Sequence, residues 1–253
     1  MSDRYHRLPE DAPRRAMVLA AGLGLRMRPL TLTRPKPLVQ VGGQTLLDHA
    51  LDRLADAGVE DAVVNAHWLA DQVETHLAAR TRAPRTHLSR EETLLETAGG
   101  IRKALPLLGD APFYVVNSDV LWLDGPVPAL TRLARRWDPA AMDFLLLLMP
   151  TVWAVGYEGR GDYHMDPAGR LRHRGSDSIA PFVAAGVMIA RPDAYRDLPE
   201  GPAGNAALWH AAETSGRLYG LRHDGPWFHV GTPESLAEVD AQVRQPRVRW
   251  AEP

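Results

Sequence analysis

The sequence predicts an α/β fold in which a mostly parallel sheet, extended into a mixed one, is flanked by helices. In the first half of the chain, short apolar runs alternate with amphipathic segments of helical length. Strands and helices that alternate in this way are joined by right-handed crossovers, which make neighbouring strands parallel. The 253 residues show no internal repeat and no change of composition that would mark a linker. We therefore expect a single domain, which this length allows.

The elements of the first half follow from local patterns. Residues 16–21 (AMVLAA) form a short apolar run that ends at Gly22, which is typical of a buried strand. In residues 46–57, leucines recur on one helical face, and Gly58 follows as a stop signal. By the same criteria, we expect further strands at 62–65, 85–89 and 113–117, and helices at 69–80 and 97–107.

The second half lacks this regular alternation. Residues 144–149 and 184–190 are apolar runs of strand length. Residues 163–172 carry a turn sequence at 166–169 and are expected to form a hairpin. Further strands are expected at 218–222 and 227–230, and helices at 205–215 and 234–243. These strands should extend the parallel sheet of the first half.

The two ends of the chain differ in composition from its middle. Residues 1–15 are charged and lack the apolar core of a secretory signal, so we expect a flexible extension. Residues 244–253 are expected to be an irregular tail, which leaves 16–243 for the folded domain. No apolar run approaches the roughly 20 residues that span a membrane. Because the chain also contains no cysteine, we expect a cytoplasmic protein.

Charge and cysteine content exclude several classes of function. The formal net charge of −2 indicates neither a nucleic-acid surface nor an acidic tail. The absence of cysteine excludes a disulfide scaffold, a thiol nucleophile and a thiolate metal site.

Residues 19–38, LAAGLGLRMRPLTLTRPKPL, are the most informative stretch of the sequence. Gly22 and Gly24 allow a tight turn and close approach of the backbone to a ligand, and N–H groups in such a turn can bind phosphates. The dinucleotide pattern G-x-G-x-x-G is not fulfilled, because Met27 stands in place of its third glycine. Cationic side chains suited to a polyphosphate follow the turn: Arg26, Arg28, Arg34 and Lys36.

Two further side chains are expected at the same edge of the sheet. Asp119 follows the strand expected at 113–117, and ligands of such sheets lie beyond the carboxyl ends of the strands. Asp119 is therefore placed to hold Mg²⁺, although an aspartate there can also cap a turn. In residues 227–236 (WFHVGTPESL), His229 ends an expected strand and is either a structural histidine or part of the site.

Residues 19–38 resemble the signature of the sugar-1-phosphate nucleotidyltransferases, L-A-A-G-x-G-x-R-M-x-P-L-T-x-x-x-P-K-P-L, at every fixed position. The resemblance implies a Rossmann-like, single nucleotidyltransferase domain. It implies that Arg26 binds the β- and γ-phosphates, that Lys36 binds the α-phosphate or the sugar phosphate, and that Asp119 binds the catalytic metal. The nucleotide would also contact the backbone of Ala20, Ala21, Gly22 and Gly24.

The resemblance also implies ligand-binding roles for two other segments. The family's loop corresponding to residues 91–100 contacts the base, which implicates Glu91, Ala98 and Gly99. A carboxylate accepts from N3–H of uracil or from N1–H and the amino group of guanine, so Glu91 leaves both bases open. Gly161 and Asp162 match a G-D-[FY] element near the acceptor sugar, with a plain hairpin start as the alternative.

The sequence departs from the family at His229. Family members often read W-x-D-V-G-T-P-E-x-L, where the aspartate is the second metal ligand. Neutral imidazole is a poor partner for Mg²⁺, which prefers oxygen. His229 can ligate a softer ion such as Mn²⁺, donate to a metal-bound water, or bind phosphate as a cation.

The resemblance implies transfer of a nucleoside monophosphate from a nucleoside triphosphate to a sugar 1-phosphate, with Mg²⁺ or Mn²⁺ as cofactor. It is strongest to the N-acetylmuramate-1-phosphate uridylyltransferases of bacterial peptidoglycan recycling, which implies UTP. Mannose-1-phosphate guanylyltransferases, which make GDP-mannose, are the alternative, and a catalytically inactive nucleotide-sugar-binding regulatory protein is a second one. We expect neither a nucleic acid nor a membrane as partner, and the oligomeric state stays open.

Overall fold

The computed structural model describes residues 8–244. Its strands are β1 (Arg15–Leu19), β2 (Gln40–Val41), β3 (Gln44–Thr45), β4 (Asp61–Ala66), β5 (Arg85–Arg90), β6 (Phe113–Asn117), β7 (Val120–Trp122), β8 (Phe144–Pro150), β9 (Tyr163–Met165), β10 (Leu171–His173), β11 (Phe182–Ala190), β12 (Leu218–Arg222) and β13 (Trp227–His229). Its α-helices are α1 (Leu46–Asp56), α2 (Ala70–Ala79), α3 (Glu96–Leu108), α4 (Ala129–Arg136), α5 (Asp193–Arg196), α6 (Ala206–Thr214) and α7 (Pro233–Arg244).

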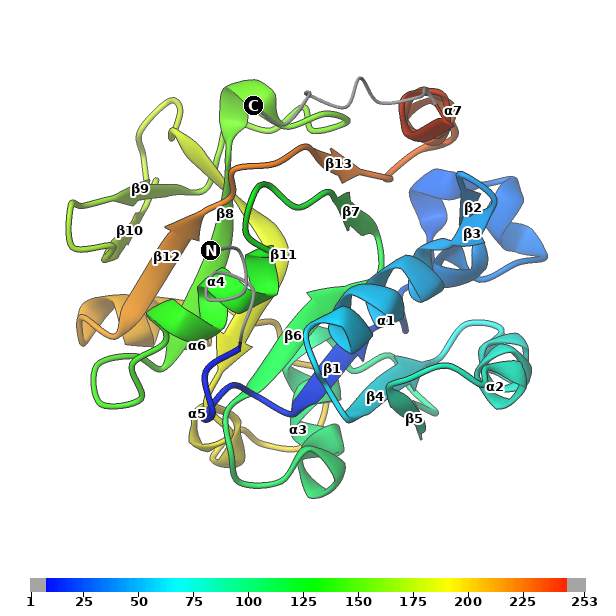
Figure 1. The fold of residues 1–253 in the computed structure, drawn as a ribbon, viewed down its shortest axis with the longest axis horizontal. Coiled ribbons are helices and arrows are strands. Elements are labelled where there is room, and N and C mark those ends of the chain that lie inside the picture. Colours follow the sequence, from blue (N-terminus) through cyan, green and yellow to red (C-terminus); the bar gives the residue numbers. More distant parts are fainter. Residues whose placement is uncertain (1–7, 245–253) are drawn as a thin grey trace.

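The central sheet is mixed, as the sequence predicts. It has nine strands, with the order β10-β9-β11-β6-β1-β4-β5 along its main path. The pairs β1–β4, β1–β6 and β4–β5 are parallel, whereas β11 runs antiparallel to β6, β8 and β9 (Figure 1). The first half therefore supplies a parallel set of strands whose carboxyl ends share one edge, and the second half extends the sheet with antiparallel pairs and the parallel pair β8–β12.

Helices cover both faces of this sheet. Alternate side chains of β1 point to opposite faces, so Ala16 and Val18 belong to one buried cluster and Met17 to another. Residues of α1, α2 and α4 pack in the first cluster, and residues of α3, α5 and α6 in the second. Burial of one large apolar side chain contributes about 1.5–3 kcal/mol, so these two clusters fix the helices on the sheet.

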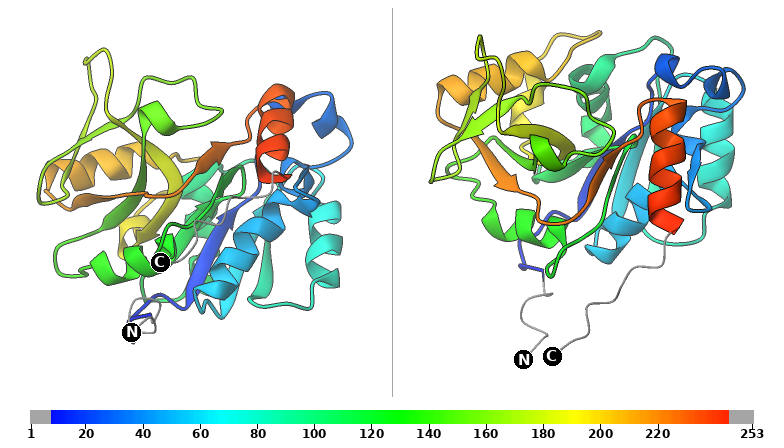
Figure 2. Two further views of the ribbon diagram at one scale, coloured as in Figure 1. Left: turned by 45° about the horizontal axis from the view of Figure 1, so that its top comes forward. Right: turned by 90° about the horizontal axis from the view of Figure 1, so that it is seen from above.

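A third, smaller cluster joins two distant parts of the chain. It is formed by Met27, Val39, Val41, Leu46, Leu121, Leu123, Phe228, Val230 and Val239. After β12 the chain crosses back over the molecule, so that β13 pairs with β7 and α7 lies beside β2 (Figures 1 and 2). The backbone N–H of Gly42 donates to Asp240 Oδ1 at 2.7 Å across this contact. The cluster thereby holds the loop after β1 against the segment around β13.

The structure differs from the predicted elements at several places. The strand expected to reach residue 21 ends at Leu19, because the N–H of Ala20 donates to a side chain, Asn65 Oδ1, at 2.7 Å. The hairpin β2–β3, strand β7 and helices α4 and α5 were not predicted; each is short, so that its periodicity is weak. Helix α3 runs from Glu96 to Leu108, one residue longer at each end than the expected 97–107.

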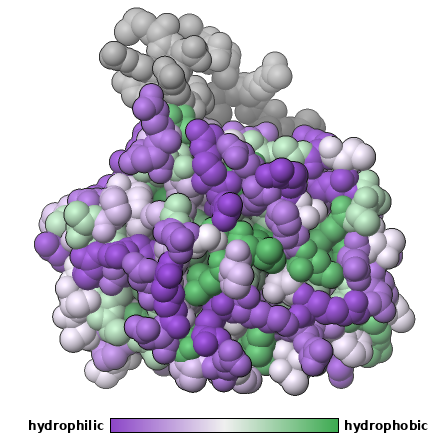
Figure 3. All heavy atoms as spheres, turned by 90° about the horizontal axis from the view of Figure 1, so that it is seen from below, coloured by the Kyte–Doolittle hydropathy of each residue, from purple (hydrophilic) through white to green (hydrophobic). Residues whose placement is uncertain are grey.

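The domain boundaries also shift. Within the segment expected to be flexible, Ala12 is buried in the first cluster, and Arg14 O accepts from Glu60 N at 2.8 Å. Residues 8–14 thus pack on the domain, and residues 1–7 and 245–253 lie outside the described part. No helix between residues 8 and 244 is long and apolar enough to cross a membrane. The face in Figure 3 is mostly hydrophilic with a hydrophobic area near its middle, a mixture that is normal for a protein surface.

Candidate active site

The loop after β1 is a turn with free backbone donors. Gly24 adopts a left-handed conformation with φ 61°, and a Cβ there would lie 2.9 Å from Thr31 Cγ2. Thr31 Oγ1 donates to Gly24 O at 2.8 Å and fixes the turn. Among the described residues, the N–H groups of residues 21–24 have no acceptor. A Cβ on Gly22 would meet no atom within 4 Å, so the backbone is open to a ligand, as the sequence predicts.

A buried pair of side chains supports this loop from behind. Asn65, at the end of β4, accepts from Ala20 N through Oδ1 and donates to Glu91 Oε1 at 2.7 Å. The other carboxylate oxygen of Glu91 accepts from Leu95 N at 3.0 Å. Glu91 is only 3% exposed. The expectation that Glu91 reads the base does not fit this structure, because both of its oxygens are bonded inside the protein. The N–H of Ala20 is likewise unavailable to a phosphate.

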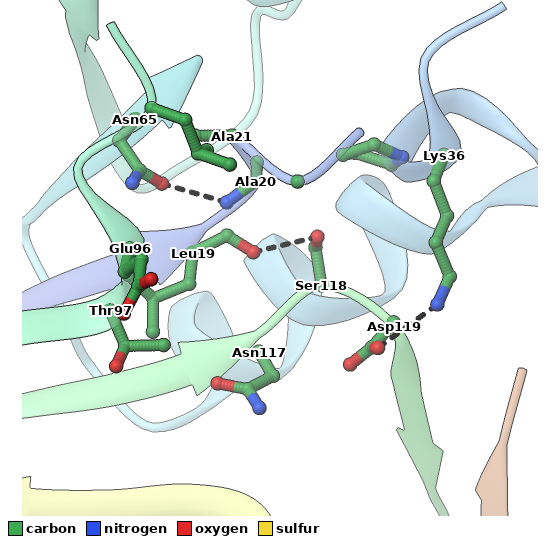
Figure 4. A pocket seen from close by; sticks show the side chains of 13 residues that line it. Leu19, Ala20, Ala21, Lys36, Asn65, Glu96, Thr97, Asn117, Ser118 and Asp119 are labelled. Carbon is green, nitrogen blue, oxygen red and sulfur yellow. Dashed lines mark hydrogen bonds and ion pairs between the residues drawn. The ribbon is translucent and has the colours of Figure 1, made fainter. Parts of the chain in front are cut away.

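A cavity of about 310 Å³ opens at the carboxyl ends of β1, β4 and β6 (Figure 4). We call it the main cavity. Lys36 and Asp119 lie at one end, and Glu96 and Thr97 at the other. The remaining lining residues are Leu19, Ala20, Ala21, Gly22, Pro37, Asn65, Leu94, Asn117 and Ser118. Predicted residues from the loop after β1 and from the end of β6 thus meet in one cavity.

Lys36, Asp119 and His229 form a charged cluster at the edge of the main cavity. Lys36 Nζ lies 2.9 Å from Asp119 Oδ2, and the Lys36 side chain is only 12% exposed. His229 Nε2 lies 3.6 Å from the same oxygen, and Val230 N donates to Asp119 O at 3.0 Å. Burial alone raises the pKa of the Asp119 carboxyl, but the neighbouring His229 and the Lys36 charge together hold it well below its usual value. Asp119 is therefore ionised at neutral pH.

His229 is held in place by contacts on two sides. Its ring stacks on that of Trp227, with centroids 6.2 Å apart and planes tilted by 10°. Its Nδ1 lies 3.3 Å from Gly156 O, and its Nε2 is directed towards Asp119. The sequence left a structural histidine open; in the structure, the imidazole faces the cluster.

Of the predicted arginines, Arg26 lies close to His229. A Cβ on Gly231 would lie 2.9 Å from His229 Cε1 and 3.5 Å from Arg26 Nη1, so Gly231 separates these two side chains. Arg26, Arg28 and Arg34 are exposed and have no ion pair among the described residues. They are available to an incoming polyphosphate.

The described residues contain no group of three or more histidine or acidic side chains that could hold a metal ion. Asp119 and His229 provide one carboxylate and one imidazole. Mg²⁺ is commonly held by one or two carboxylates together with substrate phosphates and water. The two side chains therefore fit a divalent ion only if the substrate supplies most of its ligands.

The start of α3 differs from the expectation for Ala98 and Gly99. Their N–H groups donate to Ala203 O at 2.7 and 3.0 Å, and a Cβ on Gly99 would lie 2.4 Å from Gly201 O. Neither residue lines the main cavity. These small residues make room for the 201–203 loop, not for a base. At Gly100, a Cβ would meet the Asn65–Glu91 hydrogen bond.

Gly161 and Asp162 are not at the main cavity either. Asp162 Oδ2 accepts from Ala184 N at 2.9 Å, and a Cβ on Gly161 would lie 2.2 Å from Ala180 O. Both residues fix the start of the hairpin, which was the alternative reading. A second cavity of about 330 Å³, the side cavity, adjoins the main cavity through Thr97 and Asn117. It extends along β11 to Asn205 and Trp209.

Several site residues were not predicted. Asn117 lines both cavities, and Ser118 Oγ donates to Leu19 O at 2.8 Å, which ties the end of β6 to β1. Asn65 and Asn117 each stand at the end of a parallel strand, so their position along the chain was a usable signal. Glu96 gave no such signal, because its place in the cavity depends on the fold of residues 91–97.

Comparisons with known proteins place the chain in a family. The family model described as "Nucleotidyl transferase" matches residues 15–154. The chain is 45% identical to the N-acetylmuramate alpha-1-phosphate uridylyltransferase of Caulobacter vibrioides, over 93% of this chain and 99% of that protein. It is 29% identical to the mannose-1-phosphate guanyltransferase of Aspergillus fumigatus, over 88% of this chain and 62% of that protein.

The fold has a solved counterpart in a UDP-glucose pyrophosphorylase complexed with UDP-glucose, with a TM-score of 0.76 and 16% identity over 90% of this chain and 97% of that chain. At this identity the likeness concerns the fold alone. The match of the family model over more than half of the chain and the 45% identity over almost its whole length concern the family itself. The chain belongs to the sugar-1-phosphate nucleotidyltransferases, enzymes of the nucleotidyltransferase family.

Proposed function

We propose that the protein transfers a uridylyl group from UTP to N-acetylmuramate 1-phosphate, giving UDP-N-acetylmuramate and pyrophosphate. The observation that carries the substrate assignment is the 45% identity to a uridylyltransferase for this sugar phosphate, with 99% of that protein covered. The guanyltransferase is less similar and the match covers only 62% of its length. We assign the reaction to peptidoglycan recycling in the cytoplasm on the same basis.

The chemistry is attack of a sugar-phosphate oxygen on the α-phosphorus of UTP, in line with the leaving pyrophosphate. The oxygen–phosphorus bond forms as the bond to pyrophosphate breaks. The attacking oxygen is already anionic, so the protein needs neither a nucleophile nor a strong base, and catalysis consists of positioning and charge neutralisation. The free N–H groups of residues 21–24 and the Arg26 side chain bind the triphosphate.

Lys36 has two partners in this scheme. In the structure it is paired with Asp119 at 2.9 Å. As substrate phosphates enter, Lys36 Nζ turns from the carboxylate to the α-phosphate oxygens, which need its charge most as the phosphorus is attacked. Pro35 and Pro37 flank Lys36 and stiffen the backbone from which its side chain moves.

Nucleotidyltransferases of this family generally use a divalent metal ion. Here Asp119 and His229 would hold it, and Mg²⁺ or Mn²⁺ would neutralise phosphate charge at the reacting centre. Because Mg²⁺ prefers oxygen ligands, His229→Asp should keep or raise activity with Mg²⁺, whereas Asp119→Ala should abolish it. If His229→Ala changes neither the rate nor the metal dependence, the imidazole is structural.

The acceptor sugar occupies the side cavity in this proposal. The two cavities share Thr97 and Asn117, so a sugar bound in the side cavity can direct its phosphate towards the charged cluster. The side cavity offers apolar walls from β11 and a few polar groups, a combination that suits a pyranose ring with an N-acetyl substituent.

Pyrophosphate release with a matrix of substrates tests the proposal. The four common nucleoside triphosphates are each combined with N-acetylmuramate, N-acetylglucosamine, glucose and mannose 1-phosphates in the presence of Mg²⁺ or Mn²⁺. We expect turnover with UTP and N-acetylmuramate 1-phosphate. Turnover only with GTP and mannose 1-phosphate would favour the guanylyltransferase. Absence of turnover with tight binding of a nucleotide sugar would identify a regulatory protein.

A further inference from the structure

We propose that the carboxylate of Glu96 reads the base of the bound nucleoside triphosphate by accepting a hydrogen bond from a ring N–H. The inference rests on the proposed function for the orientation of the nucleotide in the main cavity. Lys36 and Asp119 mark the phosphate end, and Glu96 lies at the opposite end (Figure 4). A nucleotide whose phosphates lie at the charged cluster therefore directs its base towards Glu96.

The other polar groups at this end already have partners. The Asn65 amide is bonded through both its oxygen and its nitrogen, and both oxygens of Glu91 accept hydrogen bonds. Thr97 Oγ1 accepts from Asn205 N at 3.1 Å. Glu96 is exposed to the cavity, and among the described residues its carboxylate has neither a hydrogen bond nor an ion pair. It is therefore the acceptor that a ligand can use.

The backbone at Glu96 is held in an unfavourable conformation. Its φ is +59°, which costs a residue other than glycine about 1–3 kcal/mol and persists only where the surroundings impose it. The surroundings are the hydrogen bonds on either side: Leu95 N donates to Glu91 Oε2 at 3.0 Å, and Ala203 N donates to Leu95 O at 3.0 Å. Glu91 is thus a positioning residue that directs its neighbour Glu96 into the cavity.

The chemistry of a carboxylate limits the bases that it can read. An ionised carboxylate only accepts hydrogen bonds. Uracil presents N3–H, and guanine presents N1–H beside its amino group. Cytosine and adenine present a ring nitrogen with a lone pair at the corresponding edge, which a carboxylate repels. Glu96 therefore selects uracil or guanine against cytosine and adenine, in agreement with UTP as the donor.

Binding of all four nucleoside triphosphates, measured by calorimetry with Mg²⁺ and without sugar phosphate, tests the inference. Wild type should bind UTP at least about tenfold more tightly than CTP, the size expected for one hydrogen bond to a charged group. Glu96→Gln should lower this ratio about tenfold, because an amide can pair with either base. Glu96→Gly should also lower it, and its thermal midpoint should not fall, since glycine adopts a positive φ freely.

Glu92→Gln is the matched control. Glu92 is an exposed carboxylate on the same loop that faces away from the main cavity, so its removal should leave the ratio unchanged. The inference is wrong if Glu96→Gln keeps the wild-type UTP-to-CTP ratio within about twofold, or if wild type prefers CTP or ATP. If wild type prefers GTP and Glu96→Gln loses that preference, Glu96 still reads the base, but the donor is GTP and not UTP. If the enzyme does not turn over N-acetylmuramate 1-phosphate, the proposed function is wrong, but the role of Glu96 in nucleotide binding is unaffected.

Discussion

Replacing Gly100 by alanine should destabilise the protein, although helix propensity alone predicts the reverse. Gly100 lies inside α3, where alanine is favoured over glycine by about 0.5–1 kcal/mol. A Cβ at this position would lie 2.7 Å from Asn65 Nδ2 and 2.7 Å from Glu91 Oε1. These two atoms form the buried hydrogen bond that supports the loop after β1.

The expected loss follows from three contributions. Breaking a hydrogen bond to a charged group costs about 1.5–3 kcal/mol. Overpacking a filled site costs about 1–3 kcal/mol. After subtraction of the helix-propensity gain, Gly100→Ala should lower the free energy of unfolding by about 1.5–5.5 kcal/mol. The variant should also bind nucleoside triphosphates more weakly, because Asn65 positions Ala20 and Glu91 positions Leu95.

Urea unfolding followed by tryptophan fluorescence measures this free energy. A double-mutant cycle with Asn65→Ala identifies the cause, since removal of the amide relieves the contact with Asn65 Nδ2 and gives the Glu91 carboxylate room to move. The double variant should then lose clearly less stability than the sum of the single variants. The reasoning is refuted if Gly100→Ala is as stable as wild type, or if the two losses simply add.

Three further outcomes are expected. Gly22→Ala should change the free energy of unfolding by less than about 0.5 kcal/mol, because its Cβ meets no atom. It should nevertheless raise KM for the nucleotide, because the proposed function brings a phosphate against this backbone; an unchanged KM would contradict phosphate binding by the loop after β1. Trp227→Phe should cost about 1–2 kcal/mol in urea unfolding, because Trp227 Nε1 donates to Ala185 O at 2.9 Å inside the core; a neutral effect would contradict this. Burial lowers the pKa of the His223 imidazole, so below about pH 6.5 the unfolded chain binds a proton that the folded chain does not, and stability falls as the pH falls. His223→Gln should reduce that slope by up to about 1.4 kcal/mol per pH unit between pH 6.5 and 5, and an unchanged slope would assign it to other groups.

The sequence alone determined the parallel half of the sheet and the charged end of the main cavity. Strand and helix periodicities are local properties, so β1, β4, β5 and β6 and their crossover helices could be located from them. Gly22 and Asp119 follow closely on the ends of β1 and β6, where chain position predicts spatial position, and Lys36 lies in the loop after β1, in a short 3-10 helix. Their meeting in one cavity follows from the topology that the periodicities already imply.

Only the tertiary structure decided the roles of the residues that depend on contacts across the chain. Glu91 and Glu96 are five positions apart in one loop and chemically alike. One is buried by Asn65, whereas the other is turned into the cavity by a positive φ that loop 201–203 and Glu91 impose. Ala98, Gly99 and Gly100 are small because neighbouring segments approach them, which no local pattern reports.

His229 lies between these two cases. The sequence located it at the end of a strand and identified the departure from the family's aspartate, but its direction depends on the third hydrophobic cluster. That cluster brings β13 back against the loop after β1, and the stack on Trp227 sets the imidazole facing Asp119 at 3.6 Å. Packing between segments about 200 residues apart along the chain therefore places the imidazole beside the loop after β1. Apolar burial depends on which residues meet in space and not on which are adjacent in sequence.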